Sequence, residues 1–209
     1  MTIEVWSDFL CPYCLLGKKR LEAALANLNI KDAEIEVKSF LLNPGTPETP
    51  GQSIREHLME KYGMDAAQVR QNFDGINQSA QDIGFVFDFD SAKHAGTDKA
   101  HALLQYAKTL GLGGAFSDRL QLAAYQEGAV LDDEATLIAL AQEIGIPQEE
   151  ASKALADESY AAKARAEYRQ SLQLGARGVP FFVIDGRYGL SGAQPIEVFE
   201  QTLAEAAGL

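Results

Sequence analysis

The two cysteines of this 209-residue sequence stand three positions apart, in the run Cys11-Pro12-Tyr13-Cys14. Two thiols at this spacing can be joined as a disulfide, and a thiolate of the pair can attack the disulfide of another molecule. A structural framework scatters its cysteines along the chain, whereas one close pair is typical of a redox or metal site. The sequence therefore predicts a dithiol that does chemistry.

The dithiol is predicted to lie where a strand gives way to a helix. Residues 2–8 alternate apolar and polar side chains as a strand does. Pro12 suits the first position of a helix, because the amide hydrogen that it lacks would have had no partner there. Small or apolar residues recur at helical spacing from Cys14 onward, which places Cys14 on the buried side and Cys11 just ahead of the helix.

These positions predict unequal roles for the two sulfur atoms. Cys11, at a helix N-terminus, can accept unpaired amide hydrogens and lies at the positive end of the helix dipole, both of which stabilise a thiolate. Cys14 faces inward, where apolar surroundings favour the neutral thiol. We expect Cys11 to be exposed and to attack, and Cys14 to resolve the mixed disulfide that forms.

Two other interpretations of the cysteines are weaker. A zinc site would need further ligands, but the chain has no second Cys-x-x-Cys, and His57, His94 and His101 lack zinc-finger spacing. Two buried, inert cysteines are the second alternative, and the position at a strand-to-helix junction disfavours it. We expect no bound metal and no bound organic cofactor.

The rest of the chain indicates a sheet interrupted by a long helical block. Ile35 and Val37 belong to a second predicted strand, which ends before the proline-rich run 43–51. Beyond that run the apolar pattern is helical, with 85–89 as a short extended link. The predicted helices are 53–62, 65–82, 98–110, 115–127, 133–145, 148–157 and 159–174.

The C-terminal part is predicted to be a strand hairpin followed by a helix. Residues 180–184 form an unbroken apolar run, typical of a strand covered on both faces. Asp185-Gly186 is a strong hairpin-turn signal, so a paired strand is expected at 188–190. Pro195 then opens a last helix.

Read end to end, this order of elements predicts an α/β protein. Removing the helical block leaves the order of a thioredoxin fold. We therefore expect a thioredoxin-fold domain formed by residues 1–43 and 159–209, with a large all-helical insertion domain at 44–158.

Charge and hydropathy argue against two classes of partner. The formal net charge of −12 leaves no basic patch to neutralise phosphates, and no stretch approaches the roughly 20 apolar residues of a membrane span. We expect neither a nucleic-acid nor a membrane partner. Residues 2–5 begin a strand at once, with no basic and apolar leader ahead of them, so we expect a cytoplasmic protein.

Four stretches resemble the DsbA-like oxidoreductases, in particular their cytoplasmic FrnE-type branch. They are residues 7–14 (SDFLCPYC), 99–104 (KAHALL), 175–182 (GARGVPFF) and 191–195 (SGAQP). The last two stretches, taken together with the dithiol, are fairly specific for this family. The four stretches span nearly the whole chain. The resemblance implies a thioredoxin domain with a helical insertion, a redox-active disulfide, and a cis peptide bond before Pro180.

The resemblance also implies a substrate-binding edge beside the dithiol, made by Pro12, Tyr13, Val179 and Pro180. In the family arrangement the backbone of Val179 pairs with an extended substrate segment. This pairing recognises the main chain of the substrate more than its side chains. Disulfide-containing proteins or small thiols are the expected substrates, and glutathione is a candidate redox partner.

The sequence departs from the wider family pattern in two respects. Many thioredoxin-fold oxidoreductases carry a buried acid six positions before the first cysteine, where this chain has Val5, and Asp8 is not assigned to that role. The Cys-Pro-Tyr-Cys sequence is also that of many glutaredoxins, so it does not decide the direction of electron flow. His101 is interpreted as a packed or capping residue of its helix.

The leading prediction is a cytoplasmic dithiol oxidoreductase acting on protein or small disulfides. Kappa-class glutathione transferases and 2-hydroxychromene-2-carboxylate isomerases look similar in architecture, but they typically place serine where this chain has Cys11. A non-catalytic chaperone, the other rival, would keep its function after both cysteines were replaced by serine. The substrate and the oligomeric state stay open at this point.

Overall fold

The computed structural model describes residues 1–44 and 51–209. The chain divides into two compact units, one formed by Met1–Leu42 with Lys163–Leu209 and the other by Asn43–Ala162. Both cysteines and all four strands of the larger sheet belong to the first unit.

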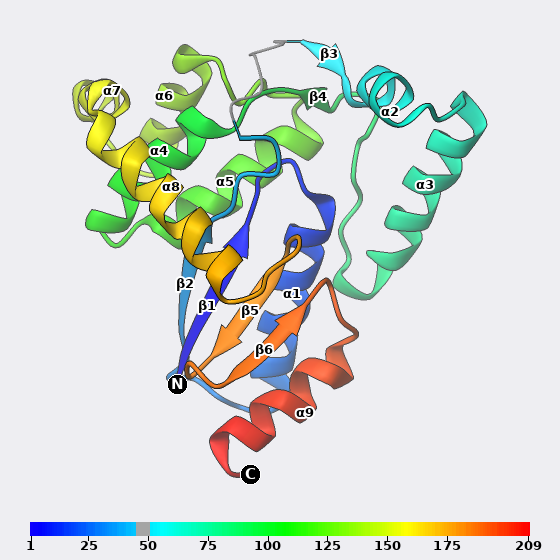
Figure 1. Cartoon of the computed structure of the whole chain (residues 1–209), viewed down its shortest axis with the longest axis vertical. Coiled ribbons are helices and arrows are strands. Elements are labelled where there is room, and N and C mark those ends of the chain that lie inside the picture. Colours follow the sequence, from blue (N-terminus) through cyan, green and yellow to red (C-terminus); the bar gives the residue numbers. More distant parts are fainter. Residues whose placement is uncertain (45–50) are drawn as a thin grey trace. The chain divides into compact units, whose positions relative to one another are not determined.

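The first unit is organised around a mixed four-stranded sheet (Figure 1). Its strands are β1 (Thr2–Ser7), β2 (Glu34–Ser39), β5 (Phe181–Ile184) and β6 (Tyr188–Ser191), in the order β2-β1-β5-β6. β1 is parallel to β2 and antiparallel to β5, and β5 is antiparallel to β6. All four residues of β5 are buried, which confirms the prediction of a strand covered on both faces.

Helices cover both faces of this sheet. On one face lie α1 (Pro12–Asn27) and α9 (Ile196–Ala207), and the other carries α8 (Glu158–Gln173) (Figure 1). The two apolar clusters follow the same division. The cluster of α1 and α9 includes Ile3, Val5, Leu21, Leu25, Phe182, Phe199 and Leu203, and that of α8 includes Trp6, Phe40, Tyr168 and Phe181.

The predicted hairpin turn between β5 and β6 is confirmed. Asp185 and Gly186 have φ values of 48° and 65°, the left-handed values that this tight two-residue turn requires. The Asp185 carboxylate accepts a hydrogen bond of 2.7 Å from the backbone N–H of Thr2, which ties the turn to the start of β1.

The second unit is mainly helical, as the sequence predicts for the insertion. Each predicted helix has a counterpart, although the one expected over 65–82 ends at Ser79 and a short 3-10 turn follows. The elements are α2 (Ile54–Tyr62), α3 (Ala66–Ser79), η1 (Gln81–Ile83), α4 (Asp98–Thr109), α5 (Gly113–Gln126), α6 (Glu134–Glu143), α7 (Gln148–Ala156) and the first residues of α8.

Two details differ from the prediction, and a third part of it falls outside the described residues. The insertion is not entirely helical, because β3 (Gln52–Ser53) pairs antiparallel with β4 (Lys93–His94), and a two-residue ladder is too short to leave an alternating pattern. The division between the units lies inside α8, which runs unbroken through the predicted boundary at 158 and 159. Within the proline-rich run 43–51, residues 45–50 lie outside the described residues. Among those described, no helix is both long and apolar enough to cross a membrane.

Helix α1 is approached unusually closely at Gly17. A Cβ atom added there would lie 2.9 Å from Cγ of Pro180, 3.1 Å from Cζ of Phe182 and 3.3 Å from Cα of Ala193. Contacts this short are tighter than real Cβ atoms tolerate without movement of the neighbour. The missing side chain therefore lets the loop before β5 and the loop after β6 both reach the helix that carries the dithiol.

We expect Gly17→Ala to lower the stability of the protein. Overpacking a filled site costs about 1–3 kcal/mol, and this exceeds the ~1 kcal/mol that alanine gains over glycine in a helix. Gly75→Ala in α3 is the matched control, because nothing lies within 4 Å of its added Cβ, and we expect it to be neutral or slightly stabilising. Urea unfolding followed by circular dichroism measures both. A Gly17→Ala protein as stable as Gly75→Ala would show that the close approach is not tight in solution.

Candidate active site

The turn between β1 and α1 is held by the side chain of Asp8. Its carboxylate is 1% exposed and accepts hydrogen bonds from the backbone N–H groups of Leu10, at 3.0 Å, and Leu42, at 3.1 Å. The carbonyl of Asp8 accepts the N–H of Cys11 at 3.2 Å. One buried side chain thus fixes both the turn ahead of the first cysteine and the segment that leaves β2.

Cys11 occupies the predicted position, the N-cap of α1, with Pro12 in the first turn. Its side chain accepts no capping hydrogen bond there, contrary to the expectation from the sequence. Instead the thiol donates to the carbonyl of Val179, with the sulfur and oxygen 3.6 Å apart. Cys11 is also less exposed than expected, at 8%, whereas the adjacent Tyr13 is 43% exposed. The sulfur is therefore directed toward a loop distant in sequence and toward Cys14, and not toward the amide groups of the first turn of α1.

Cys14 lies beneath Cys11 and is fully buried. The two side chains are 3.5 Å apart, and both cysteines are free thiols. Burial raises the pKa of Cys14 well above its ordinary value, and the hydrogen bond and charge of Cys11 raise it further. Hydrogen bonds from the Ser7 side chain and the Asp8 backbone oppose this rise in the pKa of Cys14. At neutral pH, Cys14 is therefore protonated.

The Val179–Pro180 peptide bond is cis, as the family resemblance implies. The carbonyl of Pro180 accepts the N–H of Gly192 at 2.8 Å, and Arg20 of α1 donates to the carbonyl of Ala193 at 2.9 Å. The loop before β5, the loop after β6 and the dithiol helix thus meet at one end of the sheet. Three of the four stretches that carry the resemblance converge here, and the fourth lies in α4 of the other unit.

Lys18 and Lys19, the first cationic residues of α1 after Cys14, form ion pairs. Lys18 is 7% exposed, and its ammonium lies 3.0 Å from Glu22, which also pairs with Lys19 at 2.8 Å. Burial tends to raise the pKa of Glu22, but the two lysines outweigh it and the net shift is downward. The carboxylate of Glu22 therefore balances positive charge on the helix one turn beyond Cys14.

The three histidines all lie in the second unit. The rings of His57 and His94 stack with their centroids 3.4 Å apart. His101 is fully buried within α4, in agreement with its interpretation as a packed residue. Over residues 1–44 and 51–209, no three His, Cys, Asp or Glu side chains are grouped so that they could hold a metal ion.

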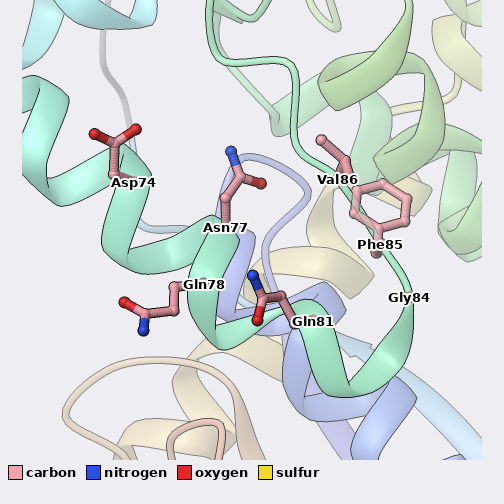
Figure 2. Close-up of a pocket in the computed structure, with 7 residues that line it drawn as sticks. All are labelled: Asp74, Asn77, Gln78, Gln81, Gly84, Phe85 and Val86. Atoms are coloured by element: carbon pink, nitrogen blue, oxygen red, sulfur yellow. The ribbon is translucent and has the colours of Figure 1, made fainter.

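The second unit also contains a hollow of about 580 Å³ (Figure 2). Polar side chains of α3 and η1 form one wall and the segment that returns from η1 forms the other; the residues are Asp74, Asn77, Gln78, Gln81, Gly84, Phe85 and Val86. Asn77 holds the returning segment through two hydrogen bonds with the backbone of Phe87, of 2.8 and 3.1 Å. None of the predicted site residues lines this hollow.

Sequence reasoning missed two residues of the site. Ser7 belongs to the predicted strand 2–8 and opens the resembling stretch 7–14, but neither pattern assigns it a role, although period-two spacing from the buried Val5 places it on the same face of the sheet. Gly17 is one of the small residues that recur at helical spacing after Cys14, and this spacing gives it no role of its own. No local pattern could reveal that Pro180 and Ala193 press against it, because these contacts join distant parts of the chain.

Comparison with known proteins agrees with this geometry. The DSBA-like thioredoxin domain family matches residues 2–204. A probable DsbA oxidoreductase from Streptomyces coelicolor superposes with a TM-score of 0.92 and 38% sequence identity, over 100% of this chain and 90% of the other. The uncharacterized protein YwbO from Bacillus subtilis is 27% identical over 205 residues, which cover 97% of this chain and 96% of YwbO.

A third relative is the cytosolic disulfide reductase DsbM from Pseudomonas aeruginosa. It superposes with a TM-score of 0.68 and 25% identity, over 100% of this chain and 99% of DsbM, and its structure with GSH superposes with a TM-score of 0.69 and 23% identity. The family match spans nearly the whole chain, and the dithiol, the cis-proline loop and the α/β fold with a helical insertion all accord with it. The chain belongs to the DsbA-like thioredoxin domain family.

Proposed function

We propose that this protein is a thiol-disulfide oxidoreductase that exchanges disulfides with protein or small-thiol substrates through Cys11 and Cys14. The observation that carries the proposal is the pair of free thiols 3.5 Å apart, one at the N-cap of α1 and the other fully buried beneath it. Membership of the DsbA-like family supports the same class of reaction.

The reaction proceeds by two exchanges. In the first, the thiolate of Cys11 attacks a substrate disulfide, a bond forms between Cys11 and one substrate sulfur, and the other leaves as a thiolate that takes up a proton. In the second, Cys14 attacks the sulfur of Cys11, the bond to the substrate breaks, and the second substrate thiol departs with the proton of Cys14. The substrate disulfide gains two electrons, and the dithiol becomes a disulfide.

The geometry fits each cysteine to one of these steps. Cys11 is the sulfur that retains access to a substrate, beside the exposed Tyr13, and it lies at the N-cap of α1. Cys14 has no access to a substrate but lies within reach of Cys11, so its attack is intramolecular and strongly favoured by proximity.

Pro12, Tyr13, Val179 and Pro180 form the proposed substrate-binding edge. In the dithiol form the carbonyl of Val179 accepts the thiol of Cys11. Ionisation of Cys11 removes that hydrogen and frees the carbonyl for a main-chain N–H of an extended substrate. Recognition through main chain would leave the enzyme tolerant of many substrate sequences.

We further propose that the protein works as a reductase in the cytoplasm and that glutathione or another small thiol restores the dithiol. The similarity to DsbM, a cytosolic disulfide reductase, supports electron flow toward the substrate disulfide and a cytoplasmic location. The structure of DsbM with GSH supports a small thiol as the electron donor. Two molecules of a thiol would reduce the Cys11–Cys14 disulfide by the reverse exchanges and leave as their own disulfide.

The buried position of Cys14 predicts selective alkylation of the dithiol. With iodoacetamide at neutral pH, Cys11 should react first and Cys14 should resist, because its pKa is raised and thiolate forms only as the pH climbs above the ordinary thiol range. Peptide mapping by mass spectrometry measures both sites, and protein unfolded in guanidinium, where both should react alike, is the control. Equal reaction of the two cysteines in the folded protein at neutral pH would contradict the assignment.

The two serine variants separate attack from resolution. Cys14→Ser should still attack a substrate disulfide and accumulate mixed disulfides, whereas Cys11→Ser should trap almost none, because only a buried and protonated thiol remains. Non-reducing gels after incubation with insulin, together with the rate of insulin reduction, show the contrast.

Each other outcome favours a named alternative. Full reductase activity of Cys14→Ser in glutathione would mean that glutathione resolves the intermediate, which is a one-cysteine mechanism. Full protection of an unfolded client by the variant lacking both cysteines, with no reductase activity in the wild type, would favour the chaperone.

A further inference from the structure

The position six residues before Cys11, where many thioredoxin-fold enzymes carry a buried acid, holds an apolar side chain in this protein. Val5 is 1% exposed and packs in the apolar cluster of α1 and α9, beside Leu21 and Phe182. It offers Cys14 neither a proton donor nor an acceptor. The buried thiol must nevertheless become an anion during resolution, and an unsolvated anion in apolar surroundings is strongly disfavoured.

Ser7 lies two residues further along β1 and therefore on the same face of the sheet as Val5. It is 4% exposed, and its side chain is hydrogen-bonded to Cys14. The backbone N–H of the next residue, Asp8, is the second partner of the same sulfur. A hydroxyl and an amide thus converge on the thiol that the mechanism requires to ionise.

The place of Ser7 is set by the sheet. Its backbone is in register with Ser39 of β2, and its carbonyl accepts the N–H of Phe40 at 3.0 Å. The following turn is fixed by the buried carboxylate of Asp8. The hydroxyl is therefore held next to Cys14 before any substrate arrives, and no reorganisation is needed when charge appears.

We propose that Ser7 is a catalytic residue of the resolving step, in which its hydroxyl donates a hydrogen bond to the Cys14 thiolate as that anion forms. The inference rests on the dithiol exchange proposed above and adds to it a residue that touches a reacting sulfur.

The step balances without an added reactant. In the mixed disulfide, Cys14 loses its proton and its sulfur bonds to the sulfur of Cys11, while the bond between Cys11 and the substrate breaks. The departing substrate thiolate gains the proton that Cys14 lost. Ser7 keeps its own proton throughout and, with the amide of Asp8, stabilises the negative charge on Cys14 before the new bond forms.

A single-turnover reaction with dithiobis(nitrobenzoate) tests this role, because each exchange releases one coloured thiolate. The first release reports attack by Cys11 and the second reports resolution by Cys14. Ser7→Ala should slow the second release about tenfold or more at neutral pH and leave the first nearly unchanged. The pH midpoint of the second release should move upward by about one unit, because the lost donor favoured the anion.

Ser171→Ala is the matched control for removing a buried hydroxyl. Ser171 is fully buried in the part of α8 that belongs to the same unit, and its hydroxyl donates to the carbonyl of Tyr168 at 2.6 Å. Its loss should lower the urea midpoint without moving the pH midpoint of the second release. A Ser7→Ala protein that behaves in this way would show that Ser7 is only structural.

The pair Ser7→Thr and Ser7→Val keeps the test decisive if Ser7→Ala does not fold. Both side chains are β-branched and similar in size, so they suit the strand equally and differ in the hydroxyl. Threonine should preserve the pH midpoint of the second release, and valine should raise it. Equal behaviour of the two would overturn the proposal for Ser7 alone. A wild-type protein that gives no second release would instead overturn the resolving role of Cys14, and the proposal with it.

Discussion

The buried carboxylate of Asp8 holds the turn on which the dithiol is presented. A carboxylate that is almost without solvent needs hydrogen-bond donors, and here two of them are the backbone N–H groups of Leu10, in the turn before α1, and of Leu42, after β2. A different path of the turn would cost the carboxylate the hydrogen bond from Leu10. The turn that leads into α1 therefore depends on this side chain.

Close packing couples the dithiol helix to the loops that face it. Pro180 and Ala193 approach the backbone of α1 at Gly17, and the carbonyl of Pro180 is tied to Gly192. The hydrogen bond from the Cys11 thiol to the carbonyl of Val179 also joins the N-cap of α1 to the loop before β5. Cys11 and the proposed substrate edge are thus held together by direct contacts, an arrangement that would align a substrate disulfide with the proposed attacking sulfur.

Neutral donors in place of a buried acid change how the second sulfur would work. A carboxylate beneath Cys14 could take up its proton, but it would also place a negative charge beside a forming thiolate. The hydroxyl of Ser7 and the amide of Asp8 stabilise the anion without adding charge, and neither is a base at neutral pH. The proton of Cys14 would then leave with the substrate thiol, which links resolution directly to product release.

The sequence by itself determined the fold class, the helical block and the unequal cysteines, because these follow from local signals: apolar periodicity, the proline after Cys11, and the turn residues Asp185 and Gly186. Tertiary structure alone decided where the Cys11 thiol points, since Val179 lies 168 positions away. It also decided the donors to Cys14 and the contacts at Gly17, which no short-range pattern encodes. The physical reason is that hydrogen bonds and close packing depend on which distant segments meet, and the sheet and its covering helices settle that only when the chain has folded.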